Sequence, residues 1–299
     1  MSVADTNINS IAKERANTTE IFSISEVSRT RTGGCVDLEL TDDVAVVIGA
    51  ARGLGLAIAA RFALEGARTI LCDRSVSVVA EAAKLLHSEA EIVDATEYES
   101  VCEAEHRIRS RHKRIDHVVY AAGVGSGKFG FPFWKLEPAD WERPIRVNLI
   151  GAVHVAHAFA PNMAEAGRGT FAFLASVAGQ IGSQTDPPYS AAKAGVINFM
   201  QCAAKDLAPF GVRANAINPG MVKTELNRSV WQSWADRQTS ESYRTYEEWT
   251  DYKIRNIVPL RRWQTPEDIA AMAVFLASKR AMNVTGQTIN VDGGYVMHS

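Results

Sequence analysis

Short apolar runs alternate with helical patterns along most of the chain. We predict strands at 44–49, 68–73, 91–94, 115–123, 169–176, 212–220 and 286–294, and helices at 54–66, 76–87, 97–112, 138–166 and 189–209. Most strand runs are apolar at consecutive positions, as in strands that are covered on both faces. Repeated strand–helix units of this kind predict an α/β protein, a single doubly wound domain with helices flanking a central parallel sheet of about seven strands.

Two stretches fall outside the repeating pattern. Residues 1–40 are polar and rich in serine and threonine, so we expect an N-terminal extension, mobile or lying on the surface or on a neighbouring subunit. Its acidic residues and its lack of an apolar core argue against a transit or signal peptide. The domain is then expected at 41–299. Pro144, inside the helical run 138–166, predicts a kink or a junction between two helices.

Composition narrows the functional class. The chain has 299 residues, 46% of them hydrophobic and 22% charged, which is typical of a globular, soluble protein. A formal net charge of -2 gives no reason to expect a nucleic acid or a membrane as partner. Four widely separated cysteines form no metal-ligand spacing, which favours a reducing, cytoplasmic location and no metal. No apolar run approaches the ~18–20 residues that cross a bilayer.

A glycine-rich turn joins the first strand to the first helix. Gly49, Gly53 and Gly55 allow a tight turn and let the backbone approach a pyrophosphate, which the free N–H groups of the helix N-terminus would bind. The spacing is GxxxGxG and differs from the usual GxGxxG fingerprint. The strand–turn–helix context favours a nucleotide site over a merely flexible turn.

Asp73 bears on which nucleotide binds. It ends the second strand, where a carboxylate can accept hydrogen bonds from the adenosine ribose and repel a 2′-phosphate, and this favours NAD. Arg52 and Arg74 lie nearby in the sequence, and either could pair with a 2′-phosphate. NADP therefore remains the alternative cofactor.

Tyr189 and Lys193 are one helical turn apart. Residues i and i+4 lie on the same helix face, about 5–6 Å apart between Cβ atoms. A free phenol has a pKa near ~10, and a neighbouring cation is expected to lower it, so that the pair could exchange a proton with an alcohol. A lone YxxxK is more often an ordinary pair on a helix.

With both motifs on one chain, the sequence resembles the short-chain dehydrogenase/reductase family over about residues 41–297. Further family-like stretches are "YAAG" (120–123), "VNLIG" (147–151), "ASVAG" (175–179), "NPGMVKT" (218–224) and "TGQTINVDGG" (285–294). Ser176 lies 13 residues before Tyr189, and Asn148 lies 28 before Ser176, both as in the family. The resemblance implies a Rossmann-like catalytic domain.

It also implies four catalytic roles. Tyr189 would be the general acid/base, and Lys193 would lower its pKa and bind the nicotinamide ribose. Ser176 would hydrogen-bond the substrate oxygen, and Asn148 would bend its helix and hold a water that links the lysine to solvent.

For the cofactor, the resemblance assigns Thr224 to the nicotinamide carboxamide, Val222 to backbone contacts with it and Asp94 to the adenine amino group. The complete cofactor set is Gly49, Arg52, Gly53, Leu54, Gly55, Asp73, Asp94, Ala122, Gly123, Asn148, Tyr189, Lys193, Pro219, Gly220, Val222 and Thr224. Ile48, Tyr120 and Ala121 depart from the family pattern. Hydrogen bonds that polar residues make there must be made otherwise or not at all.

The region 221–262 is where the family places a variable substrate lid. It carries six aromatic residues, Trp231, Trp234, Tyr243, Tyr246, Trp249 and Tyr252. These residues could close over an apolar or ring-shaped substrate, with Trp231 the best candidate, or could pack lid helices together or bury a subunit contact. Gln180, Ser183 and Gln184 stand where the family reads substrate hydroxyls, so the expected substrate-binding set is Ser176, Gln180, Tyr189 and Trp231.

The expected function is an NAD-dependent oxidoreductase that interconverts a secondary alcohol and a ketone. The alternatives are an NADPH-dependent carbonyl or 3-oxoacyl-thioester reductase and, in another class, a dinucleotide-sensing protein without catalysis. The intact Ser176, Tyr189 and Lys193 argue against the sensor. A polyol, a cyclic diol, a hydroxy acid and a steroid-like ring all remain open as substrate.

A homo-oligomer, with a tetramer favoured, is expected from two helices. The segments 146–164 and 194–208 are apolar on more than one face. One face of each packs on the sheet, so the remainder needs a partner chain or would expose a large patch. We expect these helices to pair across a two-fold axis.

Overall fold

The structure is a computed structural model and describes residues 36–183 and 185–297. Residues 38–299 form one compact unit. The expected extension at 1–40 lies, except for its last five residues, outside the described residues, as does Gln184.

The compact unit is built on a seven-stranded parallel sheet, with strand order β3-β2-β1-β4-β5-β6-β7. The strands are β1 (Val44–Ile48), β2 (Arg68–Asp73), β3 (Glu89–Ile92), β4 (His117–Tyr120), β5 (Gly169–Leu174), β6 (Val212–Pro219) and β7 (Thr288–Val291). The order reverses between β1 and β4, and ligands of such sheets bind at this switch point, outside the carboxyl ends of the strands. The predicted Rossmann-like, doubly wound fold is confirmed.

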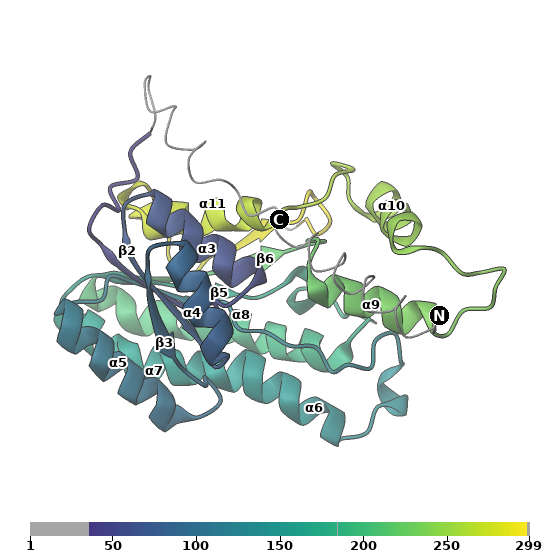
Figure 1. The fold of residues 1–299 in the computed structure, drawn as a ribbon, viewed down its shortest axis with the longest axis horizontal. Coiled ribbons are helices and arrows are strands. Elements are labelled where there is room, and N and C mark those ends of the chain that lie inside the picture. Colours follow the sequence, from purple (N-terminus) through teal and green to yellow (C-terminus); the bar gives the residue numbers. More distant parts are fainter. Residues whose placement is uncertain (1–35, 184, 298–299) are drawn as a thin grey trace, which may run out of the picture. The chain divides into compact units, whose positions relative to one another are not determined.

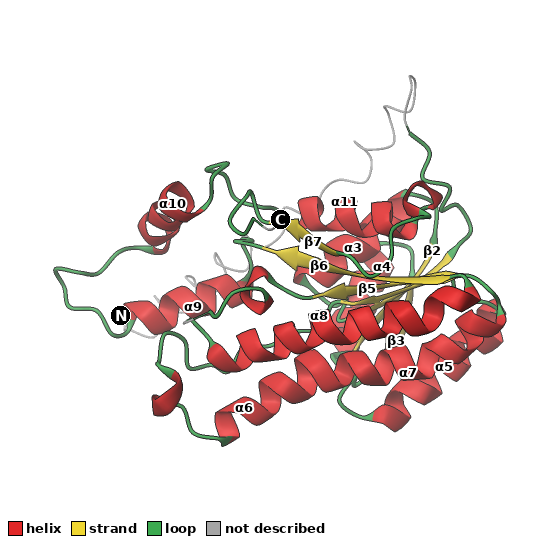
Figure 2. Ribbon diagram, turned by 180° about the vertical axis from the view of Figure 1, so that it is seen from behind, coloured by secondary structure: helices red, strands yellow, loops and turns green. Residues whose placement is uncertain are grey.

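Helices cover both faces of the sheet (Figures 1 and 2). One layer holds α3 (Gly53–Leu64), α4 (Val76–Leu85) and α11 (Pro266–Ala277), and the other holds α5 (Tyr98–His112), α7 (Gly151–Glu165) and α8 (Pro187–Leu207). Two further helices, α9 (Glu225–Ala235) and α10 (Tyr246–Ile257), lie between β6 and α11 in the sequence, within the region expected to be the lid.

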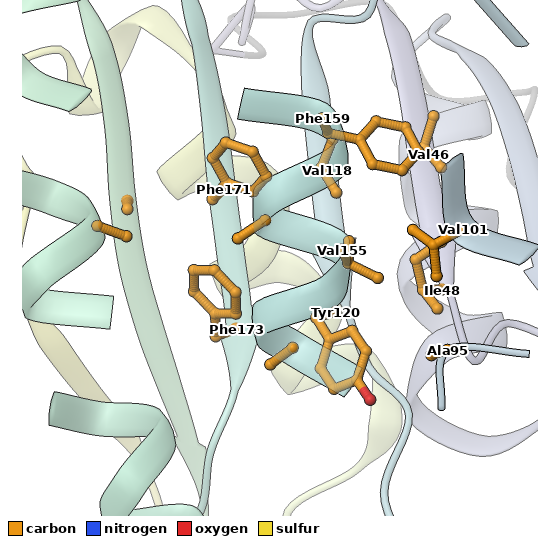
Figure 3. Close-up of a cluster of buried hydrophobic side chains, with 14 of the residues drawn as sticks. Val46, Ile48, Ala95, Val101, Val118, Tyr120, Val155, Phe159, Phe171 and Phe173 are labelled. Atoms are coloured by element: carbon orange, nitrogen blue, oxygen red, sulfur yellow. The ribbon is translucent and has the colours of Figure 1, made fainter. Parts of the chain in front are cut away.

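The hydrophobic core consists of two clusters, one on each face of the sheet. Successive side chains of a strand point to opposite faces. Accordingly, Val46 and Ile48 of β1 pack with α5, α7 and α8, whereas Ala45 and Val47 pack with α3, α4 and α11. Figure 3 shows part of the first cluster, in which side chains of the central strands meet Val155 and Phe159 of α7.

Pro144 marks the junction that the sequence predicts. Helix α6 (Ala139–Pro144) ends there, and a six-residue π-helix, Ile145–Ile150, connects it to α7. Proline lacks an N–H group and disturbs regular α-helical hydrogen bonding nearby. π-helical turns are rare and occur frequently at functional sites.

Helix α7 corrects the reasoning about helix burial. Its apolar residues are mostly buried or half-buried within the compact unit. The helix lies between α5 and α8 as well as on the sheet (Figure 2). Neighbouring helices of the same chain therefore cover most of the surface for which the sequence pattern required a partner chain.

Candidate active site

Three side chains predicted to act together meet beyond the carboxyl end of β5. Ser176 follows β5 and caps a short 3₁₀-helix, Val177–Gly179, with its Oγ 3.1 Å from the Ala178 nitrogen. Tyr189 and Lys193 project from α8, where the Lys193 ammonium lies 5.5 Å from the centre of the Tyr189 ring. A hydrogen bond joins the Ser176 and Tyr189 side chains.

Gly179 permits this arrangement. A Cβ at this position would lie 2.7 Å from the Lys193 carbonyl carbon, so only glycine lets the 3₁₀-helix pack directly on α8. Ser190 adds a second link, because its hydroxyl donates to the Ala178 carbonyl and accepts from the Ser183 N–H at 3.2 Å. Ser183, a predicted reader of substrate hydroxyls, thus uses its N–H to hold the loop.

Burial dominates the pKa values of Tyr189 and Lys193. Burial raises the pKa of Tyr189 to about 12; the Ser176 hydrogen bond lowers it and the charge of Asp186 raises it. Burial lowers the pKa of Lys193 to about 7, and its Nζ donates to the Leu174 carbonyl at 2.6 Å.

Asn148 sits in the π-helix and is fully buried. Its Nδ2 donates to the Pro144 and Val124 carbonyls, each at 2.8 Å, and its Oδ1 accepts from the Val124 N–H at 3.2 Å. The amide therefore fixes the loop after β4 to the irregular turn. Gly123 of that loop is packed closely, since a Cβ there would lie 3.1 Å from Asn148 Oδ1 and 3.5 Å from Lys193 Nζ.

The glycine turn after β1 has the geometry that the motif predicts. Gly49 and Gly53 have φ of 84° and 58°, in the left-handed region that favours glycine. A Cβ at Gly49 would lie 2.6 Å from the Ala122 nitrogen, and one at Gly55 would overlap the Gly49 carbonyl oxygen. Arg52 precedes α3 and makes no side-chain cap, which leaves the first N–H groups, including that of Leu54, for a ligand.

Asp73 lies against this turn. Its Oδ2 accepts from the Ala51 N–H at 3.2 Å and its Oδ1 from the Ser75 N–H at 3.0 Å. Arg52, one of the two cations that could pair with a 2′-phosphate, lies 3.3 Å from Glu225 at the start of α9. The turn therefore offers backbone donors for a pyrophosphate with a carboxylate beside them, and these residues fit a dinucleotide.

Asp94 follows β3, as the adenine assignment requires. Burial would raise its pKa, but hydrogen bonds from the Thr96 hydroxyl and N–H, at 2.7 and 2.9 Å, bring the pKa below its usual value. One of its oxygens is thus engaged by Thr96.

Tyr120 replaces a polar family residue and makes its own hydrogen bond. The side chain is buried, and its hydroxyl donates to the Val147 carbonyl of the π-helix. Figure 3 shows the ring between β4 and α7. Gly151 makes room for it, because a Cβ there would overlap the hydroxyl. Tyr120 thus makes a hydrogen bond of its own in place of those that a polar residue makes at this position in the family. This bond connects the central sheet to the π-helical turn that carries Asn148.

The segment after β6 carries the last cofactor candidates. Pro219 ends β6. The next residue, Gly220, packs closely against Asp292: a Cβ added at Gly220 would lie 2.6 Å from the Asp292 Cβ. Val222 is buried and pairs with Gln264 in a single bridge. Thr224 caps α9, accepting from the Asn227 N–H at 3.3 Å, so its side chain also has a structural use.

The lid aromatics contact one another. The Trp231 Nε1 donates to the Arg244 carbonyl at 3.1 Å, and its ring lies 5.7 Å from that of Tyr246. The rings of Trp234 and Trp249 are tilted relative to each other, and their centres lie 6.3 Å apart. These contacts support the alternative in which the aromatic residues pack α9 and α10 together, rather than Trp231 as a substrate wall. Gln180 directly follows the 3₁₀-helix that Ser176 caps.

The sequence reasoning missed Asp186. This buried residue precedes Pro187 and Pro188 and is the N-cap of α8. Aspartate before proline is a recognised helix-start signal, so the residue could have been noticed as a cap. Its burial and its hydrogen bond to the loop after β4 were not visible from that signal.

The described residues offer neither a membrane-spanning helix nor a metal site. Helices in this part of the chain are all too short or too polar to cross a membrane. Among residues 36–183 and 185–297, the histidines, cysteines and carboxylates form no cluster that could hold a metal ion.

Comparisons with known proteins agree with this geometry. A family model described as "Enoyl-(Acyl carrier protein) reductase" matches residues 49–296. The chain is 31% identical to an NAD-dependent glycerol dehydrogenase of Listeria innocua, with 87% of this chain and 96% of the relative covered. It is 32% identical to an acetoacetyl-CoA reductase of Synechocystis, covering 87% and 99%.

Among solved structures, a variant of actinorhodin polyketide ketoreductase with NADPH superposes with a TM-score of 0.78 at 29% identity, covering 85% of this chain and 97% of that one. The glycerol dehydrogenase is named as NAD-dependent, the ketoreductase structure contains NADPH, and all three names describe dehydrogenases or reductases of alcohol or ketone groups. The chain therefore belongs to the short-chain dehydrogenase/reductase family, as an oxidoreductase of alcohol and ketone groups that uses a pyridine nucleotide.

Proposed function

We propose that the protein is an NAD-dependent dehydrogenase of a secondary alcohol, with Tyr189 as general acid/base. The observation that carries the proposal is the meeting of Ser176, Tyr189 and Lys193 at the edge of the sheet that also bears the glycine turn. The bound nicotinamide ring would accept or supply the hydride.

The residues of the chain handle the oxygen and its proton. Ser176 Oγ would bind the substrate oxygen next to the Tyr189 hydroxyl and stabilise charge that develops on it. Tyr189 would remove the proton during oxidation and return it during reduction. Lys193 would bind the nicotinamide ribose, and burial lowers the pKa of this lysine toward the range in which it can exchange a proton.

Asp73 supports NAD as the cofactor. Its carboxylate is fixed by two backbone N–H groups beside the glycine turn, where it would accept ribose hydroxyls and repel a 2′-phosphate. The glycerol dehydrogenase relative is named as NAD-dependent. The remaining assigned contacts, from Asp94, Ala122, Gly123, Pro219, Gly220, Val222 and Thr224, belong to this proposal.

An NADPH-dependent reductase of 3-oxoacyl thioesters is the second candidate. The acetoacetyl-CoA reductase relative and the NADPH-bound ketoreductase structure favour it. Arg74, directly after Asp73, is the cation that would have to pair with a 2′-phosphate.

One set of assays separates the two candidates. Secondary alcohols are offered with NAD or NADP at alkaline pH, and acetoacetyl-CoA with NADH or NADPH, while reduced-nicotinamide absorbance is followed. We expect alcohol oxidation with NAD and its loss in Tyr189→Phe. A clear preference for NADP would refute the Asp73 argument. Confirmed NAD binding without turnover of any substrate would favour a sensor.

We also propose a cytoplasmic homo-oligomer, most simply a tetramer. The free cysteines Cys72, Cys102 and Cys202 support a reducing location. Exposed Ala191 and Ala194 of α8, and Ile150 before α7, are surface on which a second copy could pack. Light scattering that gives the monomer mass at micromolar concentration would overturn this assembly.

A further inference from the structure

Asp186 carries a buried carboxylate that receives no cap hydrogen bond of normal geometry from the helix it begins. It caps α8 three residues before Tyr189, and its exposed fraction is only 4%. The next two residues are prolines, which have no N–H to donate. The Asp186 side chain makes no cap hydrogen bond of normal geometry with the helix, although a backbone hydrogen-bond interaction with the Tyr189 N–H lowers the pKa of the carboxylate.

The two carboxylate oxygens differ. Oδ2 accepts from the Ser126 N–H at 2.9 Å, in the loop after β4. Oδ1 is shielded from solvent and has no hydrogen-bond partner of normal geometry among residues 36–183 and 185–297. A buried carboxylate oxygen without a donor is costly, and such an exception in a native protein needs an explanation. Burial raises the pKa of Asp186, against the lowering effect of the hydrogen bonds from Ser126 and from the Tyr189 backbone.

Asp186 borders the reaction site. Its charge raises the pKa of the Tyr189 hydroxyl, so the two groups interact electrostatically. The loop that holds Oδ2 is the same loop whose Gly123 lies against Lys193 Nζ and Asn148. Asp186 thus interacts both with the catalytic tyrosine and with the loop after β4.

We propose that Asp186 is a specificity-determining residue, whose free Oδ1 accepts a hydrogen bond from a substrate hydroxyl next to the carbon that is oxidised. The substrate class is then a polyol with neighbouring hydroxyls. This inference rests on the proposed alcohol dehydrogenase function. An ionised carboxylate only accepts hydrogen bonds, so it binds a hydroxyl but offers nothing to a thioester carbonyl or a substrate carboxylate.

The hydroxyl reaches Oδ1 only if the covering loop shifts. Phe129 packs against Gly125, since its Cε1 would lie 2.6 Å from a Cβ there, and Asp186 Oδ2 would lie 2.8 Å from the same atom. A site closed in this way excludes water, so a substrate without the second hydroxyl leaves the carboxylate unpaired. A buried polar group that is left unpaired makes an enzyme discriminate most strongly against substrates that lack the matching hydroxyl.

The test compares three substrates that differ at one position: butane-2,3-diol, butan-2-ol and 3-methoxybutan-2-ol. The methyl ether keeps the oxygen of the diol but cannot donate. For the wild type we expect kcat/KM with NAD to be about 10- to 100-fold higher for the diol than for either analogue, the usual value of a hydrogen bond to a charged group. In Asp186→Ala this ratio should fall to about one.

Asp186→Asn keeps the size and the capping preference and guards against misfolding, with thermal unfolding and NAD affinity measured on both variants. Its ratio should also fall, because the Ser126 N–H takes the amide oxygen and the amide nitrogen, a donor, replaces Oδ1. Asp251→Asn, which removes an equal charge from an exposed ion pair on α10, should leave the ratio unchanged.

Two results would overturn the inference. If Asp186→Ala and Asp186→Asn lower kcat/KM equally for all three alcohols, Asp186 only positions Tyr189, and the dehydrogenase proposal stands. If the wild type oxidises none of the alcohols with NAD or NADP but reduces acetoacetyl-CoA, the polyol assignment fails together with the dehydrogenase proposal.

Discussion

The contact between Tyr120 and Gly151 allows a quantitative test of how this chain fixes β4 to the π-helix. The Tyr120 hydroxyl donates to the Val147 carbonyl, and a Cβ at residue 151 would overlap that hydroxyl. Gly151→Ala should therefore destabilise the wild type. After Tyr120→Phe has removed the oxygen, the same change should be tolerated.

The magnitudes follow from separate effects. Tyr120→Phe loses one buried hydrogen bond, at about 0.5–1.5 kcal/mol of unfolding free energy. Gly151→Ala should cost about 1–3 kcal/mol of unfolding free energy by overpacking the site. It should also gain about 1 kcal/mol from the higher helix propensity of alanine, because Gly151 has helical backbone angles at the start of α7. Without the hydroxyl, the nearest atoms are the Ala95 oxygen at 3.2 Å and Cζ of residue 120 at 3.3 Å. The two changes should then couple by about 1–3 kcal/mol.

The assay is urea unfolding, followed by far-ultraviolet circular dichroism at one protein concentration, for the wild type, both single variants and the double variant. Gly182→Ala is the matched control, because an added Cβ there meets no atom within 4 Å. It should show no coupling to Tyr120→Phe. Additivity of Tyr120→Phe and Gly151→Ala within about 0.5 kcal/mol would refute the reasoning.

Three further predictions concern the site. Tyr189→Phe should lower turnover by about 10²–10⁴-fold with NAD affinity nearly kept, and residual activity above about a hundredth of wild type would contradict the acid/base role. Lys193→Ala should weaken both turnover and NAD binding, and an NAD dissociation constant that calorimetry finds unchanged would exclude the ribose contact. A tyrosine whose pKa is raised stays protonated as pH rises, so without cofactor the ultraviolet difference between wild type and Tyr189→Phe should show no tyrosinate below about pH 10. Ionisation near neutral pH would mean that Lys193 does lower the pKa.

The sequence determined the fold and the residues of the candidate site. Strand periodicity, the glycine turn and the YxxxK spacing are local patterns, and each depends on neighbours a few residues away. Such patterns predicted a parallel sheet with a nucleotide turn, and the fixed geometry of one helix placed Tyr189 beside Lys193. Pro144 predicted its junction for the same reason, since proline acts on its own helix.

The pKa values of the site residues depend mainly on burial, and burial is set by the tertiary structure. From the sequence, Lys193 was expected to lower the pKa of Tyr189, because charge and spacing were all that could be read. In the folded chain both groups are desolvated, which raises the pKa of the phenol and lowers that of the ammonium. The free Asp186 Oδ1 likewise depends on how the loop after β4 packs on α8.

Contacts between distant segments were also beyond the sequence. Tyr120 reaches Val147 across 27 positions, and the lid aromatics pair with each other across α9 and α10. Helix α7 is apolar on several faces because α5 and α8 flank it, and the sequence could not distinguish this cover from that of a partner chain. Residue type shows that a surface must be covered, whereas only the packed chain shows which segment covers it.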